Sequence, residues 1–444
     1  MANIGFISLG CAKNQVDCER MMYRVQEAGF TVQPDVVGSD VVVINTCGFI
    51  DSAKSEAIDH ILQMAQLKEQ GLIGKILVTG CLSQRYQDQI LQELPEVDGI
   101  LGTGSYSQIV SAIETLLSDK TVSEFGSIDA PEEETGRILT TPEHYAYIKI
   151  AEGCDNRCAY CIIPYLRGRF RSRSMDDVLY EARLLADSGV KELIVVAQDT
   201  SRYGTDLKEH KRLLPELLRS LCQVEGFDWI RLHYVYPDEI DDALIDVIAS
   251  EQKIVKYLDI PIQHCNDKIL KLMNRRGDGT YLRQLFTKLR SRIPGLVLRT
   301  SVITGLPGEG EEEFAQLCQF LKEMRLERVG AFPFSPEEGT PAAQMEYPDQ
   351  EIAISRAQMI ETIQSAIMDE YNESMIGQTL RVLVDGYDED FEQFYGRTFA
   401  DSPEIDGRVW IASEEALAEG EFVTVCIDSV IDGDLSGYIV EEEI

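Results

Sequence analysis

Short apolar runs alternate with longer amphipathic stretches through the first part of the chain. Three runs whose β-branched residues predict strands cover residues 4–8, 41–45 and 75–79. Helical spacing predicts helices over 17–28 and 52–69, with Ser52 as the N-cap of the second. Because strands alternate with helices, residues 1–137 are predicted to form a parallel α/β domain.

The same alternation resumes beyond residues 131–142, where Pro, Glu, Thr and Gly predict a linker. Six further apolar runs are predicted strands, at 147–151, 192–197, 229–234, 257–262, 297–303 and 329–334. Helical segments fill the gaps between these runs. Residues 140–376 are therefore predicted to form a partial (β/α)6 barrel.

The pattern changes again at Gly377, where the helical spacing stops. Short β-rich segments separated by Asp and Gly turns follow at 379–384, 393–399 and 421–427. They predict a small five-stranded β-barrel over 377–444. The chain of 444 residues is long enough for these three domains, each with a core of its own.

Composition indicates the compartment and the kind of chemistry. The hydrophobic fraction of 44% is ordinary for a folded protein. The N-terminus has no basic region, and no run reaches the roughly 18 apolar residues of a membrane span, so a cytoplasmic protein without membrane contact is expected. Eleven cysteines in such a chain favour metal or redox chemistry over disulfides.

Charge narrows the choice of partner. The chain has 41 basic and 76 acidic residues, for a net charge of −35. Residues 377–444 hold three arginines, no lysine and 18 acidic residues, which gives this part alone a net charge of −15. Such a surface repels phosphate backbones and attracts a basic protein. Contact with RNA is expected only through a larger assembly that also contains protein.

The most informative motif is a group of three cysteines, Cys154, Cys158 and Cys161, at the spacing CxxxCxxC. Three thiolates on one loop can hold three irons of a 4Fe–4S cluster and leave the fourth iron open to a small molecule. A structural zinc site is the alternative. Zinc favours paired CxxC motifs and four ligands, which this loop does not offer.

Three other cysteines, Cys11, Cys47 and Cys81, each follow a predicted strand of the first domain beside a glycine. In a parallel sheet the carboxyl ends of neighbouring strands meet at one edge. A single cysteine there is most simply a small core residue. Three at equivalent strand ends are expected to converge, which predicts a second 4Fe–4S cluster with three protein ligands.

These features together resemble the radical S-adenosylmethionine (SAM) methylthiotransferases. The resemblance covers essentially the whole chain and extends to the last domain, which resembles the TRAM barrel of that family. The motifs that carry it are Gly10-Cys11, Asn45-Thr46-Cys47-Gly48, Thr79-Gly80-Cys81, the loop from Cys154 to Cys161, Ile163-Pro164, Arg167-Gly168 and Arg171-Ser172-Arg173. Further runs resemble the branch that modifies small-subunit ribosomal protein number twelve, namely 8–14, 197–204, 231–237 and 259–264.

The resemblance implies a two-part reaction with two 4Fe–4S clusters and SAM as cofactors. One SAM donates a methyl group towards a sulfur held at the N-terminal cluster. A second SAM is cleaved at the barrel cluster, and its radical removes hydrogen from an unactivated carbon, which is Cβ of an aspartate in the branch named above. An electron donor and a sulfur source are implied as partners, and the sequence identifies neither.

The resemblance also suggests further site residues. Tyr160 is expected beside the adenine of SAM, and Gly305 and Gly308 belong to a motif on its adenine side. Gln198 and Asp199 occupy a strand end where many relatives have a Gly-Gly-Glu run against the SAM amino group, although this chain departs from that pattern. Basic candidates for the SAM carboxylate or the target aspartate are Arg167, Arg171 and Arg173, and surface salt bridges are the alternative role for them.

Two other functions compete with this interpretation. The same chemistry could act on tRNA adenosine, but RNA-binding barrels carry basic patches and this one is acidic. The protein could instead be a non-enzymatic iron–sulfur redox sensor or adaptor. An open iron is unnecessary for that role.

Overall fold

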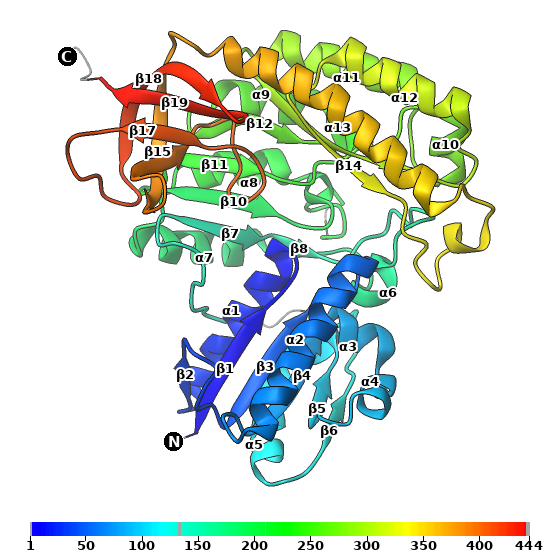
Figure 1. Ribbon diagram of the computed structural model, residues 1–444, viewed down its shortest axis with the longest axis vertical. Coiled ribbons are helices and arrows are strands. Elements are labelled where there is room, and N and C mark those ends of the chain that lie inside the picture. Colours follow the sequence, from blue (N-terminus) through cyan, green and yellow to red (C-terminus); the bar gives the residue numbers. More distant parts are fainter. Residues whose placement is uncertain (1, 132–134, 209, 441–444) are drawn as a thin grey trace.

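The computed structural model describes residues 2–131, 135–208 and 210–440. Figure 1 shows three parts: an N-terminal α/β part, a large sheet with its helices, and a small barrel beside that sheet. The predicted fold class is confirmed. Of the predicted linker, residues 132–134 lie outside the described residues, as do 441–444 of the last predicted domain. The boundaries 1–137, 140–376 and 377–444 stay predictions.

The N-terminal part is built on one sheet of six parallel strands in the order β2-β1-β3-β4-β5-β6. The strands are β1 (Asn3–Ser8), β2 (Thr31–Gln33), β3 (Val41–Thr46), β4 (Lys75–Gly80), β5 (Gly99–Leu101) and β6 (Val122–Glu124). The helices are α1 (Ala12–Glu27), α2 (Asp51–Glu69), α3 (Cys81–Tyr86), α4 (Asp88–Glu93) and α5 (Ile109–Leu117), with the 3-10 helix η1 (Thr103–Gln108). The sequence did not predict β2, β5 and β6, because a run of three residues is too short to show a hydrophobic period.

Helices cover both faces of this sheet. The side chains of β3 are apolar on both faces, so each face needs a covering layer. Val42 and Ile44 pack in one core with α2, and Val41 and Val43 pack in another with α1 and α5. Such continuous apolar runs are typical of strands buried on both faces. Two local predictions were wrong: α1 begins at Ala12, well before residue 17, and the N-cap of α2 is Ile50 instead of Ser52.

The central part is an open sheet of six parallel strands in the order β14-β13-β12-β11-β10-β7. The strands are β7 (Tyr145–Lys149), β10 (Glu192–Val196), β11 (Trp229–Leu232), β12 (Ile254–Asp259), β13 (Val297–Thr304) and β14 (Arg328–Pro333), with the short pair β8 (Ala151–Glu152) and β9 (Arg171–Ser172). The helices are α6 (Ile163–Arg167), α7 (Met175–Asp187), α8 (Leu214–Cys222), α9 (Asp242–Ser250), α10 (Asp267–Leu272), α11 (Gly279–Arg292), α12 (Glu311–Met324) and α13 (Gln350–Glu373), with the 3-10 helices η2 (Thr200–Arg202), η3 (Pro237–Glu239) and η4 (Ala342–Gln344). The predicted partial barrel is confirmed.

Alternate residues of these strands point to opposite faces of the sheet. Val195 and Leu232 pack in the core that the surrounding helices form, whereas Ile194 and Val196 pack with Val16 of α1. The N-terminal part therefore inserts its first helix against the inner face of the open sheet. Among the described residues, no helix is long and apolar enough to cross a membrane.

The C-terminal part is a closed barrel in the order β15-β16-β17-β19-β18. Its strands are β15 (Thr379–Asp388), β16 (Gln393–Arg397), β17 (Val409–Ala412), β18 (Phe422–Ile431) and β19 (Asp434–Ile439). The connection between β16 and β17 contacts the inner face of the central sheet, where Ser402 lies 2.9 Å from His233 and Tyr257 donates to Asp406 at 2.7 Å. The small barrel is therefore attached to the central sheet by buried polar contacts.

Candidate active site between two cysteine triads

The first triad lies at the carboxyl edge of the N-terminal sheet. Cys11 is the N-cap of α1, Cys47 follows β3, and Cys81 opens α3 directly after β4. The loop before Cys11 lies tight against Cys47, because a Cβ added at Gly10 would lie 2.7 Å from the Cys47 Cβ. Gly10 also has a φ of +92°, which favours glycine. The charge of Cys11 acts on both Cys47 and Cys81, so the three thiols lie near one another; that they hold a cluster stays a prediction.

The second triad lies on the loop between β8 and α6. Two residues beyond α10 hold this loop in place: the Ala159 N–H donates to the Met273 carbonyl at 2.9 Å, and the Asn274 side chain donates to the Arg157 carbonyl at 3.0 Å. Cys158 is buried, and Cys154 and Cys161 are half-buried. The loop is thus fixed by contacts that do not require a bound metal.

The donor sets fit iron–sulfur clusters better than single ions. Among the described residues, no group of three His, Cys, Asp or Glu side chains is placed to hold one metal ion. A 4Fe–4S cluster makes a different demand, because each of three thiolates binds its own iron and the sulfurs stand farther apart. Each triad consists only of cysteine, the ligand that such clusters use.

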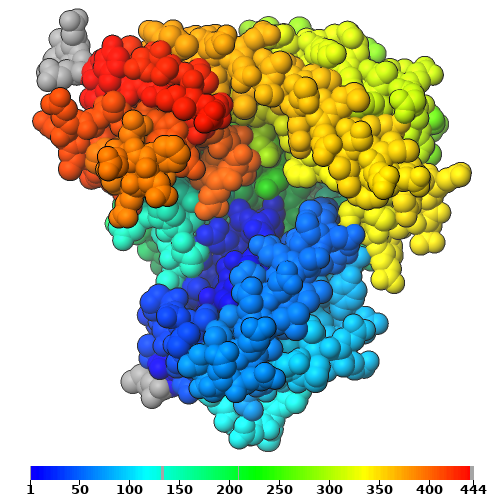
Figure 2. Space-filling model, viewed as in Figure 1, coloured from blue at the N-terminus to red at the C-terminus, as the bar shows by residue number. Residues whose placement is uncertain are grey.

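A cavity lies between the loop after Cys47 and the loop of the second triad, and its lining residues include none of the six cysteines. Its volume is about 470 Å³, which is in the range of small-molecule sites. One wall comes from the loop after Cys47, at Phe49 and Ile50, and the other from Tyr160 and Ile303 of the central part. At the rim, the buried Glu337 accepts from Arg85 at 2.5 Å and from Lys54 at 3.1 Å. Figure 2 shows the blue N-terminal part packed under the central part, with a yellow segment reaching down beside it.

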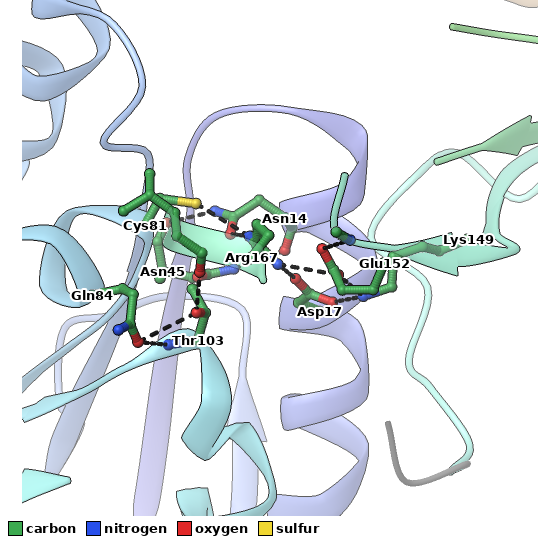
Figure 3. Close-up of polar contacts among 12 residues, drawn as sticks. Asn14, Asp17, Asn45, Cys81, Gln84, Thr103, Lys149, Glu152 and Arg167 are labelled. Atoms are coloured by element: carbon green, nitrogen blue, oxygen red, sulfur yellow. Dashed lines mark hydrogen bonds and ion pairs between the residues drawn. The ribbon is translucent and has the colours of Figure 1, made fainter. Parts of the chain in front are cut away.

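Arg167 joins the two parts at this site. Figure 3 shows it between Cys81 on one side and Asp17 and Glu152 on the other. Its Nε lies 3.3 Å from the Cys81 sulfur, its Nη1 lies 2.5 Å from Asp17, and its Nη2 donates to Asn14 at 2.9 Å. The guanidinium is 3% exposed. Every nitrogen of Arg167 is therefore engaged inside the protein.

The other two predicted arginines differ from each other. Arg173 is buried and pairs with Glu181 at 2.7 Å, while donating to the Lys149 carbonyl at 2.8 Å. Arg171 is partly exposed and donates to the Arg169 carbonyl at 2.6 Å. Its buried Nε has no hydrogen-bond partner among the described residues. Arg171 also pairs with Asp129 at 3.7 Å, and it lines a different cavity, together with Asp17, Glu152 and Arg167.

Gln198 and Asp199 lie at the end of β10, beside the second triad. Gln198 donates to Glu152 at 2.5 Å, so it joins the network around Arg167. Asp199 accepts from Asn156 of the cysteine loop at 2.7 Å and from Ser201 at 2.5 Å. Burial raises the pKa of Asp199 to about 6. The structure thus places both residues near the cluster loop, and both have protein partners.

Of the remaining predicted residues, Tyr160 lines the cavity, whereas the two glycines are explained by helix packing. Tyr160 lines it and is 9% exposed. Gly305 and Gly308 have φ values of +73° and +82°, and added Cβ atoms would meet Ala353 at 2.4 Å and Leu272 at 2.8 Å. Close packing of the helices α13 and α10 therefore accounts for both glycines.

Cys11 differs in acidity from its neighbours Cys47 and Cys81, because burial raises the pKa of Cys47 to about 11 and also raises that of Cys81. Burial raises the pKa of Cys154 to about 12, and it also raises that of Cys161, with the neighbouring Cys158 adding to the effect. Cys11 is exposed, and although desolvation by the surrounding protein opposes its ionisation, the Lys13 ammonium and the Arg167 guanidinium lower its pKa. The first triad therefore has a thiol prepared to bind as thiolate.

The sequence did not single out several residues that the structure places at the site. Lys149 pairs with both Asp17 and Glu152, and Arg275 and Tyr236 contact Cys158. A lysine at the end of an otherwise apolar strand is a signal that could have been used, because a buried charge needs a partner. No comparable signal marks Arg275, which follows a short helix.

Comparison with known proteins agrees with the order of the three parts. The sequence matches Uncharacterized protein family UPF0004 over residues 3–102, the Radical SAM superfamily over 148–321 and the TRAM domain over 376–440. A solved structure, the radical SAM methyltransferase TsrM of Kitasatospora setae, is similar at a TM-score of 0.57 and 12% identity, over 87% of this chain and 79% of that one. That likeness concerns the fold alone.

Two relatives are similar over their whole length. The chain is 48% identical over 440 residues to the ribosomal protein uS12 methylthiotransferase RimO of Caldanaerobacter subterraneus subsp. tengcongensis, covering 98% of this chain and 100% of that protein. It is 46% identical over 439 residues to the protein of the same name from Thermoanaerobacter sp., again at 98% and 100% coverage. A radical SAM enzyme implies a 4Fe–4S cluster and SAM. Since the identity extends from end to end, the chain belongs to the RimO family of radical SAM methylthiotransferases.

Proposed function

We propose that this chain adds a methylthio group to Cβ of an aspartate in ribosomal protein uS12. The observation that carries the proposal is the full-length similarity to proteins named for that activity. A cavity whose walls come from the loop after Cys47 and from the loop of the second triad supports it, because the reaction needs a sulfur carrier and a radical generator close together. An electron donor and a sulfur source would complete the system.

In this proposal the two triads hold separate 4Fe–4S clusters. Cys154, Cys158 and Cys161 would hold the one that supplies the electron for SAM cleavage. Cys11, Cys47 and Cys81 would hold the second, at which the sulfur is carried. Tyr160 would lie along SAM in the cavity, where Phe49 and Ile303 exclude water from the reaction. Of the remaining candidates for SAM, Asp199 would act through the cysteine loop and Gln198 through Glu152. Gly305 and Gly308 would act through helix packing.

Binding of the target aspartate falls to Arg171 in this proposal. Its side chain is 21% exposed and its ion pair with Asp129 is long, at 3.7 Å, so an incoming carboxylate could replace that partner at the arginine fork. Arg167 and Arg173 would position the surrounding elements through their buried ion pairs. An Arg171→Lys variant keeps the charge but lacks the fork, so it should raise KM for the substrate more than it lowers kcat.

The test is mass spectrometry of uS12 after anaerobic incubation with the enzyme, SAM, a reductant and sulfide. The proposal expects the mass of one methylthio group on an aspartate. A parallel incubation contains a tRNA anticodon stem-loop. A methylthio mark on adenosine, with uS12 unmodified, would replace the proposal by the tRNA function. If metal analysis finds iron and sulfide in the protein but neither substrate is modified, the result would favour an iron–sulfur sensor or adaptor.

The acidic barrel supplies an independent test of the partner. Its net charge of −15 should attract a basic protein, with the effect screened over a Debye length of roughly 8 Å at physiological salt. Reversal of exposed charges (Glu389→Lys, Asp390→Lys and Glu414→Lys) should slow association with uS12. Asp388 is unsuitable, because its carboxylate accepts the N–H groups of Asp390 and Phe391 and stabilises the turn. Unchanged association would remove the barrel from substrate recruitment.

A further inference from the structure

A buried cation lies against the second triad and has no carboxylate partner among the described residues. Arg275 is 8% exposed. Its Nη1 lies 3.8 Å from the Cys158 sulfur, 3.1 Å from the Tyr160 hydroxyl and 2.5 Å from the Tyr236 hydroxyl. Its Nη2 donates to the Pro261 carbonyl at 2.6 Å. All these partners are neutral apart from the cysteine when it binds iron as thiolate.

This arrangement is unusual because a buried charge without a counter-ion is costly. An arginine keeps its charge at any ordinary pH. The thiolate of Cys158 and the cluster that it binds provide the missing negative charge. The positive charge of Arg275 is therefore placed to balance the negative charge of the cluster and its thiolates.

Tyr236 adds a second donor to the same sulfur. Its hydroxyl lies 2.7 Å from the Cys158 sulfur and accepts a hydrogen bond from Arg275, whose guanidinium also stacks 4.3 Å from its ring centroid. An iron-bound sulfur carries no proton, so the tyrosine must donate to it. Donation from arginine to tyrosine strengthens the bond from tyrosine to sulfur.

We propose that Arg275 and Tyr236 together stabilise the reduced state of the barrel cluster. Reduction by an external low-potential donor adds one electron and one negative charge, and no bond is made or broken. A neighbouring cation and hydrogen bonds to the sulfur favour the more negative state. In a chain with a net charge of −35, such local compensation makes the cluster easier to reduce.

The inference rests on the barrel cluster of the proposed function. Its test needs no ribosomal protein, so this inference and the proposed function can fail separately. Full-length protein with Cys11, Cys47 and Cys81 replaced by alanine is reconstituted anaerobically, so that one cluster remains. The equilibrium constant for its reduction is measured by a potentiometric titration followed by electron paramagnetic resonance. Iron content, expected at about four per chain, reports the loading.

Two substitutions remove the donors. Arg275→Gln should lower the reduction equilibrium constant about tenfold, which is 59 mV for one electron. Tyr236→Phe, which removes only the hydroxyl, should lower it about threefold. Matched controls are Arg276→Gln and Tyr281→Phe, because Arg276 pairs with Asp238 and Tyr281 donates to the Pro237 carbonyl, without contact to a cysteine. Both controls should leave the constant unchanged.

An unchanged or increased constant in Tyr236→Phe at full iron content would overturn the proposal. So would shifts of equal size in the controls. If Arg275→Gln fails to bind iron, Arg275→Lys replaces it in the test. It keeps the charge but cannot contact the sulfur and both tyrosines at once, so it should lower the constant less than tenfold. A constant equal to that of the parent protein in Arg275→Lys and in Tyr236→Phe would likewise refute the proposal.

Discussion

The two cysteine triads are assembled in different ways. The barrel triad lies on a single loop, residues 154–161, and its spacing is visible in the sequence. The N-terminal triad comes from three strand ends far apart in the chain, and only the parallel sheet brings them to one edge. The first is thus a local motif, and the second is a product of topology.

The triads also differ in how their charge is balanced. Arg167 beside Cys81 pairs with Asp17 and Glu152, so its charge is already compensated by the protein. Among the described residues, Arg275 has only neutral partners apart from Cys158 itself. The difference indicates that Arg167 mainly joins two parts of the molecule, whereas Arg275 acts on its cluster.

The largest expected effect comes from removing the barrel triad. Replacement of Cys154, Cys158 and Cys161 by alanine should abolish cleavage of SAM to 5′-deoxyadenosine, since no open iron remains to bind SAM. The variant should keep about half of the iron of the reconstituted wild type, about four of eight atoms. Chromatography of the nucleoside products and iron analysis measure both. Full cleavage activity, or loss of all iron, would contradict the division between the triads.

Removing the N-terminal triad should separate the two halves of the reaction. Alanine at Cys11, Cys47 and Cys81 should abolish the methylthio product, because the sulfur carrier is lost, while SAM is still cleaved by the barrel cluster. The same chromatography, with mass spectrometry of uS12, measures the two outcomes together. A product formed at the wild-type rate would show that this triad carries no sulfur.

Breaking the link at Arg167 should destabilise the protein. Among the described residues, Arg167→Met leaves Lys149 as the cation that pairs with the two buried carboxylates of Asp17 and Glu152. We expect a loss of about 3 kcal/mol in the free energy of unfolding, as is usual when one partner of a buried ion pair is removed. Denaturant titration measures it. The matched control is Arg169→Met. Because the Arg169 side chain is 77% exposed, this substitution should lower the free energy of unfolding by less than about 1 kcal/mol. Equal losses would show that the network contributes no specific stability.

The acidity of the thiols gives the smallest and most local test. In iron-free protein at pH 8, Cys11 should react with iodoacetamide at least about a hundredfold faster than Cys154, because its pKa is lowered and that of Cys154 is raised to about 12. With rising pH, the rate at Cys11 should level off at a lower pH than that at Cys154, which should still increase above pH 10. Peptide mapping by mass spectrometry follows both sites.

A variant that removes one positive charge near Cys11 is the control for the comparison of Cys11 with Cys154. Lys13→Met removes one of the two cations that lower the pKa of Cys11, so its alkylation should slow at pH 8 and reach its plateau at higher pH. Cys18, whose pKa burial raises to about 12, should remain slow in both proteins. Equal rates at Cys11 and Cys154 would show that the cations do not act on the first triad.

The sequence by itself determined the fold class, the order of the three parts and the CxxxCxxC loop, because period and spacing are local properties. That the six cysteines bind clusters stays a prediction. The strand positions of the central sheet follow from apolar runs, and the CxxxCxxC loop needs no tertiary information. The short strands β2, β5 and β6 were missed, since three residues pair only where neighbours already exist.

Only the tertiary structure decided how charges are paired around the cysteines. Arg167, predicted as a ligand for substrate or SAM, is enclosed by Asn14, Asp17 and Glu152, which come from two parts of the chain. Arg275 reaches Cys158 from another loop and carried no sequence signal. Long-range ion pairs form only when separate elements are packed, so no period or spacing in the sequence can predict them.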